Sequence, residues 1–278
     1  MTVAAALSIA GLVTLLQGVG PERESAIDAL ADSSEHVIVA VLEGVNWRGR
    51  DGVVASLERA TPPRVEMLTE LSLSHPKLAT RRSAIRALGR VGAEGTCAKL
   101  VEMLGQGSDA VILDAMRGRS DCRAEFFRKF LDSNDRDSRR RAFLGLTEMD
   151  PDEAGERAVS LLGDQDHGVR YAASTFLVKH LDRAIGRVVE SMSGFDQVGR
   201  LTALELLGRS TDAQAAGVLE ATLNSKRWPE RRMAALSIGA NGGTGSLKLL
   251  KSALDRETHV LVREAMQKSV EKIEAKSE

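Results

Sequence analysis

Apolar residues recur along this chain at positions i, i+3, i+4 and i+7, within stretches of helix length. Gly, Pro, Asp and Asn separate these stretches, for example at residues 149–153, 163–168 and 241–243. No stretch alternates apolar and polar residues with period two for long enough to form a strand. The pattern therefore predicts an all-α chain without a sheet.

The helix-length stretches also repeat. Segments that begin with Arg and continue with small and apolar residues start at 82, 140, 170, 200, 232 and 263, with a degenerate copy at 110–116. The apolar ends of the preceding helices fall at 42, 73, 104, 131, 162, 192, 223 and 254. Both series step by roughly 31 residues, a period typical of helical repeats. Over 278 residues this predicts one α-solenoid domain of about nine stacked helical hairpins, a superhelix with divergent cap repeats over 1–60 and clearer repeats over 61–278.

The amino-acid sequence of the repeat resembles that of a known family. In DQDHGVRYAASTFL (164–177), Asp166 precedes Arg170 by four residues, and Asp196 precedes Arg200 by the same interval. This spacing is similar to that of HEAT repeats, in particular the short repeats first noted in phycobilisome lyases. The resemblance extends over residues 77–270. It implies that the Asp caps the second helix of each hairpin and that the Arg bonds with neighbouring repeats, and it implies a fold rather than one function.

The first residues predict a terminal helix over 2–17. Residues 2–20 have no charged side chain, and small or polar residues recur every third position at Ser8, Gly11, Thr14 and Gln17. A secretory signal would need a basic segment before the apolar stretch, and a membrane span would need a more uniformly apolar one. We therefore expect an amphipathic helix that caps the solenoid, without membrane contact, whose spare apolar surface would allow a homodimer.

Residue patterns for catalysis or cofactor binding are missing from the sequence. No two of the five histidines lie three or four residues apart, and the His-Glu dipeptides of HEAT-like metal hydroxylases do not occur. We therefore predict no catalytic, metal-binding or cofactor-binding residues, and no cofactor. Cys97 and Cys122 lie outside any CxxC motif. The sequence favours reduced, buried cysteines that act as small apolar residues, and hence a cytoplasmic protein.

Charge is distributed in bands. Residues 117–141 hold nine basic and five acidic side chains, whereas the net charge of the whole chain is −1. A second basic band spans 226–263, and acidic bands span 1–60 and 151–220. Because the 117–141 band follows the degenerate repeat, it is the candidate partner-binding surface. Its candidate residues are Arg117, Arg119, Arg123, Arg128 and Arg139. Arg140 is left out because the repeat pattern gives it a structural role.

These observations favour a non-enzymatic scaffold or adaptor that binds a protein partner through the surface of the solenoid. Two alternatives stay open. A bilin-lyase-like enzyme subunit is an alternative by analogy of fold. A nucleic-acid-binding HEAT-like protein is another, because basic bands occur in a chain with almost no net charge.

Overall fold

A computed structural model describes residues 7–241 and 244–276, and within them every regular element is helical. The chain divides into two compact units, residues 1–149 and 150–278. Unit 1 holds α1 (Ile9–Gln17), α2 (Pro21–Ala31), α3 (Glu35–Gly44), α4 (Trp47–Arg59), α5 (Val65–Ser74), α6 (Leu78–Arg90), α7 (Thr96–Glu102), α8 (Asp109–Met116), α9 (Ala124–Arg128) and α10 (Arg136–Met149). Unit 2 holds α11 (Pro151–Leu161), α12 (His167–Lys179), α13 (Leu181–Ser191), the 3-10 turn η1 (Met192–Gly194), α14 (Gln197–Leu207), α15 (Ala213–Thr222), α16 (Trp228–Asn241), α17 (Thr244–Arg256) and α18 (Val260–Ala275).

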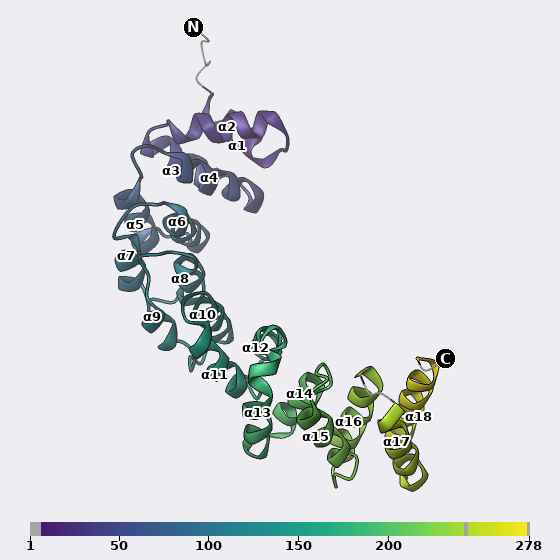
Figure 1. The fold of residues 1–278 in the computed structure, drawn as a ribbon. Coiled ribbons are helices and arrows are strands. Elements are labelled where there is room, and N and C mark those ends of the chain that lie inside the picture. Colours follow the sequence, from purple (N-terminus) through teal and green to yellow (C-terminus); the bar gives the residue numbers. More distant parts are fainter. Residues whose placement is uncertain (1–6, 242–243, 277–278) are drawn as a thin grey trace. The chain divides into compact units, whose positions relative to one another are not determined.

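The helices form nine successive hairpins within the described residues, as the two series of repeat markers predict. In each hairpin an odd-numbered helix is followed by an even-numbered one (Figure 1). The even helices pack on one another along each unit, from α2 to α10 in unit 1 and from α12 to α18 in unit 2. Their buried faces consist mainly of Ala, Leu, Ile and Val. One hairpin alone leaves such a face exposed, so the stacking of neighbours completes the core.

The N-terminal helix starts later than the sequence predicts. Helix α1 spans Ile9–Gln17, with Ser8 as its N-cap, and residues 2–6 of the predicted helix lie outside the described residues. Leu12 and Leu16 are buried, and α1 packs against α2, α3 and α4 as an amphipathic helix would. None of the described helices is both long and apolar enough to cross a membrane.

Acidic N-caps begin several even helices, as the family resemblance implies. The Asp166 carboxylate accepts hydrogen bonds from the backbone N–H groups of Gly168 and Val169, and Asp196 accepts from Gly199. These bonds satisfy donors that a helix N-terminus otherwise leaves without partners. These caps help to fix where α12 and α14 start.

The repeated Arg lies four residues after the N-cap. Its guanidinium donates to backbone carbonyl oxygens of the loop that precedes the helix, in Arg81, Arg139, Arg170, Arg200, Arg231 and Arg263. Three of the predicted positions were therefore wrong by one residue. Arg139 holds the structural position that the sequence analysis gave to Arg140, and Arg81 and Arg231 replace Arg82 and Arg232.

Close contacts join the last even helices of unit 2. The Ser237 hydroxyl of α16 donates to the carbonyl of Leu204 in α14 at 3.0 Å, and the Ser269 hydroxyl of α18 donates to Ala235 in α16 at 2.8 Å. A Cβ atom added at Gly239 would lie only 2.4 Å from the Ser269 hydroxyl oxygen. A glycine at this point therefore allows the two helices to approach closely enough for the serine to reach a backbone carbonyl.

Buried ion pairs join the same hairpins. Arg200 of α14 donates to the Glu230 carboxylate of α16 at 2.6 Å, and Arg231 of α16 binds Glu257, before α18, through two bonds of 2.6 and 2.9 Å. The Glu230 and Glu257 side chains are almost fully buried. Hydrogen bonds from Arg231 lower the pKa of Glu257 to about 2. In unit 2 the structural Arg thus bonds with a neighbouring repeat, as the family resemblance implies, at two of its positions.

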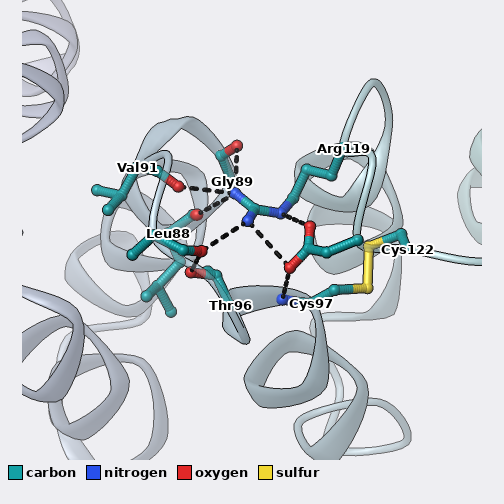
Figure 2. Close-up of a disulfide and its surroundings, with 9 residues drawn as sticks. Leu88, Gly89, Val91, Thr96, Cys97, Arg119 and Cys122 are labelled. Carbon is teal, nitrogen blue, oxygen red and sulfur yellow. Dashed lines mark hydrogen bonds and ion pairs between the residues drawn. A yellow bond between two sulfur atoms is a disulfide. The ribbon is translucent and has the colours of Figure 1, made fainter.

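The cysteines are joined, which corrects the prediction that they are reduced. Cys97 at the start of α7 and Cys122 after α8 form a disulfide across 25 residues, with their Cα atoms 5.4 Å apart (Figure 2). Both residues are buried, as predicted. The prediction of reduced thiols failed because pairing depends on the distance between Cα atoms in the fold, which the sequence spacing does not reveal. The expectation of a cytoplasmic protein thereby loses the argument from reduced cysteines.

Arg119 lies beside this disulfide and closes the end of α6. Its guanidinium donates to the carbonyls of Leu88, Gly89 and Val91 at 3.3, 3.3 and 2.8 Å (Figure 2), and a further bond reaches Ala93. The C-terminal carbonyls of a helix lack partners within the helix, and a cation satisfies them well. Arg119 is therefore a structural residue that ties the loop after α8 to the end of α6.

Asp121 links Arg119 to the disulfide. Its carboxylate accepts from the Arg119 guanidinium at 2.9 Å and from the backbone N–H of Cys97 at 3.0 Å. Burial alone would raise the pKa of the Asp121 carboxyl, but these hydrogen bonds outweigh it and hold the pKa below its ordinary value. The degenerate repeat is thus held by a charge network and a covalent bond.

Candidate functional site

The five predicted arginines differ in their contacts. Arg117 lies at the end of α8 and pairs with Asp114 and Glu148. Arg119 and Arg139 donate to backbone carbonyls, as described above. Arg123 is the exposed N-cap of α9, and Arg128 is exposed in the last turn of that helix. Their common role in partner binding stays a prediction, and three of the five have contacts that serve the fold.

A different surface feature stands out in unit 2. The described part of this unit exposes six large apolar side chains, and five of them lie in the first two turns of successive even helices. We call these five the edge row: Tyr171, Val198, Trp228, Val260 and Leu261. Isolated exposed apolar residues are ordinary, whereas a series near the starts of successive even helices calls for an explanation. The edge row is therefore the candidate functional site.

Contacts between neighbouring helices place the edge row along one side of unit 2. The indole ring of Trp228 in α16 stacks on the imidazole of His259, the N-cap of α18, with ring centres 4.3 Å apart and planes 11° from parallel. Tyr171 and Val198 line the same cavity between α12 and α14. The pair of Arg200 and Glu230 joins the first turns of α14 and α16. The N-terminal ends of all four helices therefore adjoin one another.

A cavity of about 510 Å³ opens between α12 and α14, with a small contribution from α16. Apolar groups of Tyr171, Val178, Leu201 and Met233 alternate in its wall with hydroxyl and charged groups. Lys179 and Arg209 lie where α12 and α14 end. The Tyr171 side chain is 66% exposed, so its ring is available to a partner rather than to the core. Such a wall suits an apolar side chain with polar groups beside it.

The C-terminal half of the edge row has an excess of positive charge. Around Trp228, Val260 and Leu261, the exposed cations are Lys226, Arg227, Arg232, Arg256 and Arg263, against the exposed carboxylates of Asp255 and Glu264. The two other acids of this region are buried: Glu230 is held by Arg200 and Arg227, and Glu257 by Arg231. Burial would raise the pKa of Glu230, but hydrogen bonds from Ser225, Arg200 and Arg227 keep it below its ordinary value. Both acids are therefore neutralised by paired cations at neutral pH.

Unit 1 has only part of the same feature. Trp47 and Leu78 occupy the first positions of α4 and α6 and are exposed, as Trp228 is in α16. At the next two even helices the first positions are Asp109 and Arg136. None of the large exposed apolar side chains lies in α8 or α10, so the series stops after α6 in the described part of unit 1, whereas in unit 2 it continues through α12, α14, α16 and α18.

The sequence analysis missed the edge row although its signal was present. The exposed aromatic residues Trp47, Tyr171 and Trp228 are far apart in the sequence. Each lies one or five residues after the N-cap of an even helix. Counting positions from the cap, rather than distance along the chain, would have shown that each of them lies near the start of an even helix. In the described part of the chain, no three His, Cys, Asp or Glu side chains gather where they could hold a metal ion.

Comparisons with known proteins agree with this architecture. A family model described as HEAT repeats matches residues 35–117 and 185–271, which together are more than half of the chain. The crystal structure of YibA from Escherichia coli is 14% identical, covers 92% of this chain and 98% of its own, and superposes with a TM-score of 0.53. At that identity the likeness shows the fold alone. Human deoxyhypusine hydroxylase in complex with glycerol is 16% identical and covers 96% of each chain, but its TM-score of 0.36 supports no argument. A search of curated proteins found no match. The chain belongs to the HEAT-repeat family.

Proposed function

We propose that this protein is a non-enzymatic scaffold or adaptor, and that it binds an extended segment of a partner protein along the edge row of unit 2. The edge row is the observation that supports this function, because a series of exposed apolar side chains on adjacent helices fits a polypeptide better than a small substrate. The HEAT-repeat fold supports a general role in protein interaction.

The geometry of stacked helices suits an extended segment. Neighbouring packed helices lie about 8–10 Å apart. An extended chain advances about 3.3 Å per residue. Every third residue of a bound segment would therefore meet a new helix of the row. Since the row belongs to helices that are already folded, little ordering of this chain would oppose association.

Capture of the partner tests this function. We would purify tagged protein from its own cells and compare three forms: wild type, the double variant Tyr171→Ser with Leu261→Ser, and Leu249→Ser. Leu249 and Leu261 are matched, since each is 45% exposed and only Leu261 belongs to the row. We expect the double variant to lose at least about tenfold of the captured partner, because truncated anchor residues dominate such interfaces.

Leu249→Ser should capture as much as wild type. Both variants should keep their helical circular dichroism and melting temperature, because their substituted side chains are on the surface. Equal capture by all three forms would contradict the proposed function. Of the basic candidates, Arg123 is exposed and could then be tested by Arg123→Glu.

A further inference from the structure

The two halves of the edge row differ in their chemistry. Its first half, at α12 and α14, lies in the acidic band of residues 151–220. Its second half combines exposed apolar side chains with the cation excess described above. Trp228, Val260 and Leu261 are 40, 66 and 45% exposed, and Lys226 and Arg232 on either side of Trp228 are exposed as well. The second half therefore offers apolar and positive groups together.

We infer that the second half of the edge row binds an acidic segment of a protein partner, with an apolar side chain of that segment packed against Trp228, Val260 and Leu261. This inference rests on the proposed function and specifies the chemistry of the bound segment. Carboxylates of the segment bind the guanidinium of Arg232 and the ammonium of Lys226. The planar fork of Arg suits a carboxylate, and exposed cations accelerate the encounter with an acidic partner.

The stack of Trp228 on His259 prepares the apolar part of this surface. The imidazole covers one face of the indole ring, with ring centres 4.3 Å apart. A ring fixed in this way loses little side-chain freedom when a partner packs against it. Val260 and Leu261 follow His259 directly, so they extend the apolar surface from the stack onto the first turn of α18.

Other anionic partners fit the same surface less well. Single-stranded nucleic acid needs several aromatic side chains on which bases can stack, whereas Val260 and Leu261 are aliphatic. An anionic membrane favours a broad apolar face with basic residues along it. The edge row follows a line of helix ends instead, with Glu264 and Asp255 among its neighbours. A polypeptide that alternates acidic and apolar residues matches such a line.

Three synthetic peptides test the inference by fluorescence anisotropy with the full-length protein. The first is fluorescein-labelled (Asp-Leu-Glu)4, with Leu at every third position. The second, (Asn-Leu-Gln)4, removes the charge, and the third, (Asp-Ser-Glu)4, removes the apolar side chains. We expect the first to bind at least about tenfold more tightly than either of the others, because both kinds of contact contribute.

Charge reversal locates the site. Lys226→Glu with Arg232→Glu should weaken binding of (Asp-Leu-Glu)4 at least about tenfold. The matched control is Arg183→Glu with Lys248→Glu, which changes the net charge equally on the odd helices α13 and α17. It should leave binding within about twofold. Equal effects of the two double variants would overturn the location of the site.

The remaining outcomes separate this inference from the proposed function. Equal binding of (Asn-Leu-Gln)4 would overturn the acidic chemistry and leave the row as a polypeptide-binding surface. No binding of (Asp-Leu-Glu)4 would also overturn the inference, while the capture experiment with Leu261→Ser and Leu249→Ser still decides the function. Polyuridylate and phosphatidylserine vesicles are measured beside the peptides. If either binds through Lys226 and Arg232 and the acidic peptide does not, the partner is that anion and the inference is wrong.

Discussion

The degenerate hairpin of unit 1 and the last hairpins of unit 2 are joined to their neighbours by different means. In unit 1 the short hairpin of α7 and α8 lacks the structural Arg, and Ile112 occupies that position. The guanidinium of Arg119 joins the loop after α8 to the end of α6 instead, and a disulfide joins α7 to the same loop. In unit 2 the Arg is kept, and ion pairs and serine hydroxyls connect successive hairpins. Neighbouring hairpins are therefore joined by specific bonds in both regions, although the chemistry of these bonds differs.

Removal of the disulfide should have the largest effect and should reach unit 1 only. A bond that closes a loop of about 25 residues restricts the unfolded chain, and its loss typically lowers the free energy of unfolding by about 3 kcal/mol. We expect Cys97→Ser with Cys122→Ser to speed hydrogen exchange in α6, α7 and α8, as measured by mass spectrometry.

Helices α16 and α18 should exchange as before in that variant. Dithiothreitol should reproduce the effect in wild type and change nothing in the double variant, which is its control. If hydrogen exchange became faster to the same extent in both units, the expectation that the disulfide stabilises only unit 1 would be wrong.

Acid should weaken the ion pairs that join the hairpins of unit 2. The pKa of Glu257 is lowered from 4.5 to about 2 by its hydrogen bonds with Arg231. A carboxyl with a lowered pKa stabilises the fold above its ordinary pKa, and this contribution is lost as the pH falls from about 4.5 towards 2. We expect Glu257→Gln to lower the stability of α16 and α18 by about 2 kcal/mol at pH 7.

The measurement is urea unfolding of wild type and Glu257→Gln at a series of pH values. The difference between them should shrink below pH 4.5, because acid then removes the same charge from the wild type. A difference that stays constant down to pH 2 would show that the lowered pKa of Glu257 is not what stabilises unit 2.

Each serine tie in unit 2 should be weaker than the ion pairs. Ser269→Ala removes a buried hydrogen bond between α18 and α16, which typically contributes about 1 kcal/mol. Ser160→Ala is the control, because the Ser160 hydroxyl is exposed and bonds within its own helix. Thermal melting should fall for the first variant and stay nearly unchanged for the second; the reverse order would refute a role for Ser269 in joining the helices.

Loss of an exposed ion pair in unit 2 should have the smallest effect on the free energy of unfolding. Glu205 lies in the last turn of α14 and Arg209 follows the end of that helix, and both side chains are more than half exposed. Such pairs contribute little because water screens their charges. We expect Glu205→Gln to change the free energy of unfolding by less than about 0.5 kcal/mol in urea titrations. A loss comparable to that of Glu257→Gln would show that burial is not what distinguishes the two pairs.

The sequence predicted hairpins better than it predicted individual contacts. Apolar spacing gave the all-helical fold and the period because both follow from faces that neighbouring helices must bury. The structural Arg was misplaced where two or three arginines are adjacent, as at Arg139 and Arg140, since a period of about 31 residues cannot choose between neighbours. The distance from the N-cap makes that choice, and Asp135 indicates Arg139.

Contacts between residues far apart in the sequence could not be predicted from apolar spacing and the repeat period. The pairing of Cys97 with Cys122, and the reach of Arg119 to the carbonyls of α6, depend on how the degenerate hairpin sits on its neighbour. No periodic signal marks these residues, because they replace the regular repeat. The edge row was periodic and could have been found by position within the repeat.

The ion pairs of unit 2 limit how this chain could have grown by duplication. Glu230 lies inside the first turn of α16, whereas Glu257 lies before α18, yet each reaches the structural Arg of the hairpin before it. The two carboxylates thus come from different places in their repeats. A copied or exchanged hairpin would bring its carboxylate to the wrong place and leave a half-buried guanidinium unpaired. The last hairpins are therefore alike in fold, but their order along the chain is fixed, because each carboxylate is placed to reach the Arg of one particular hairpin.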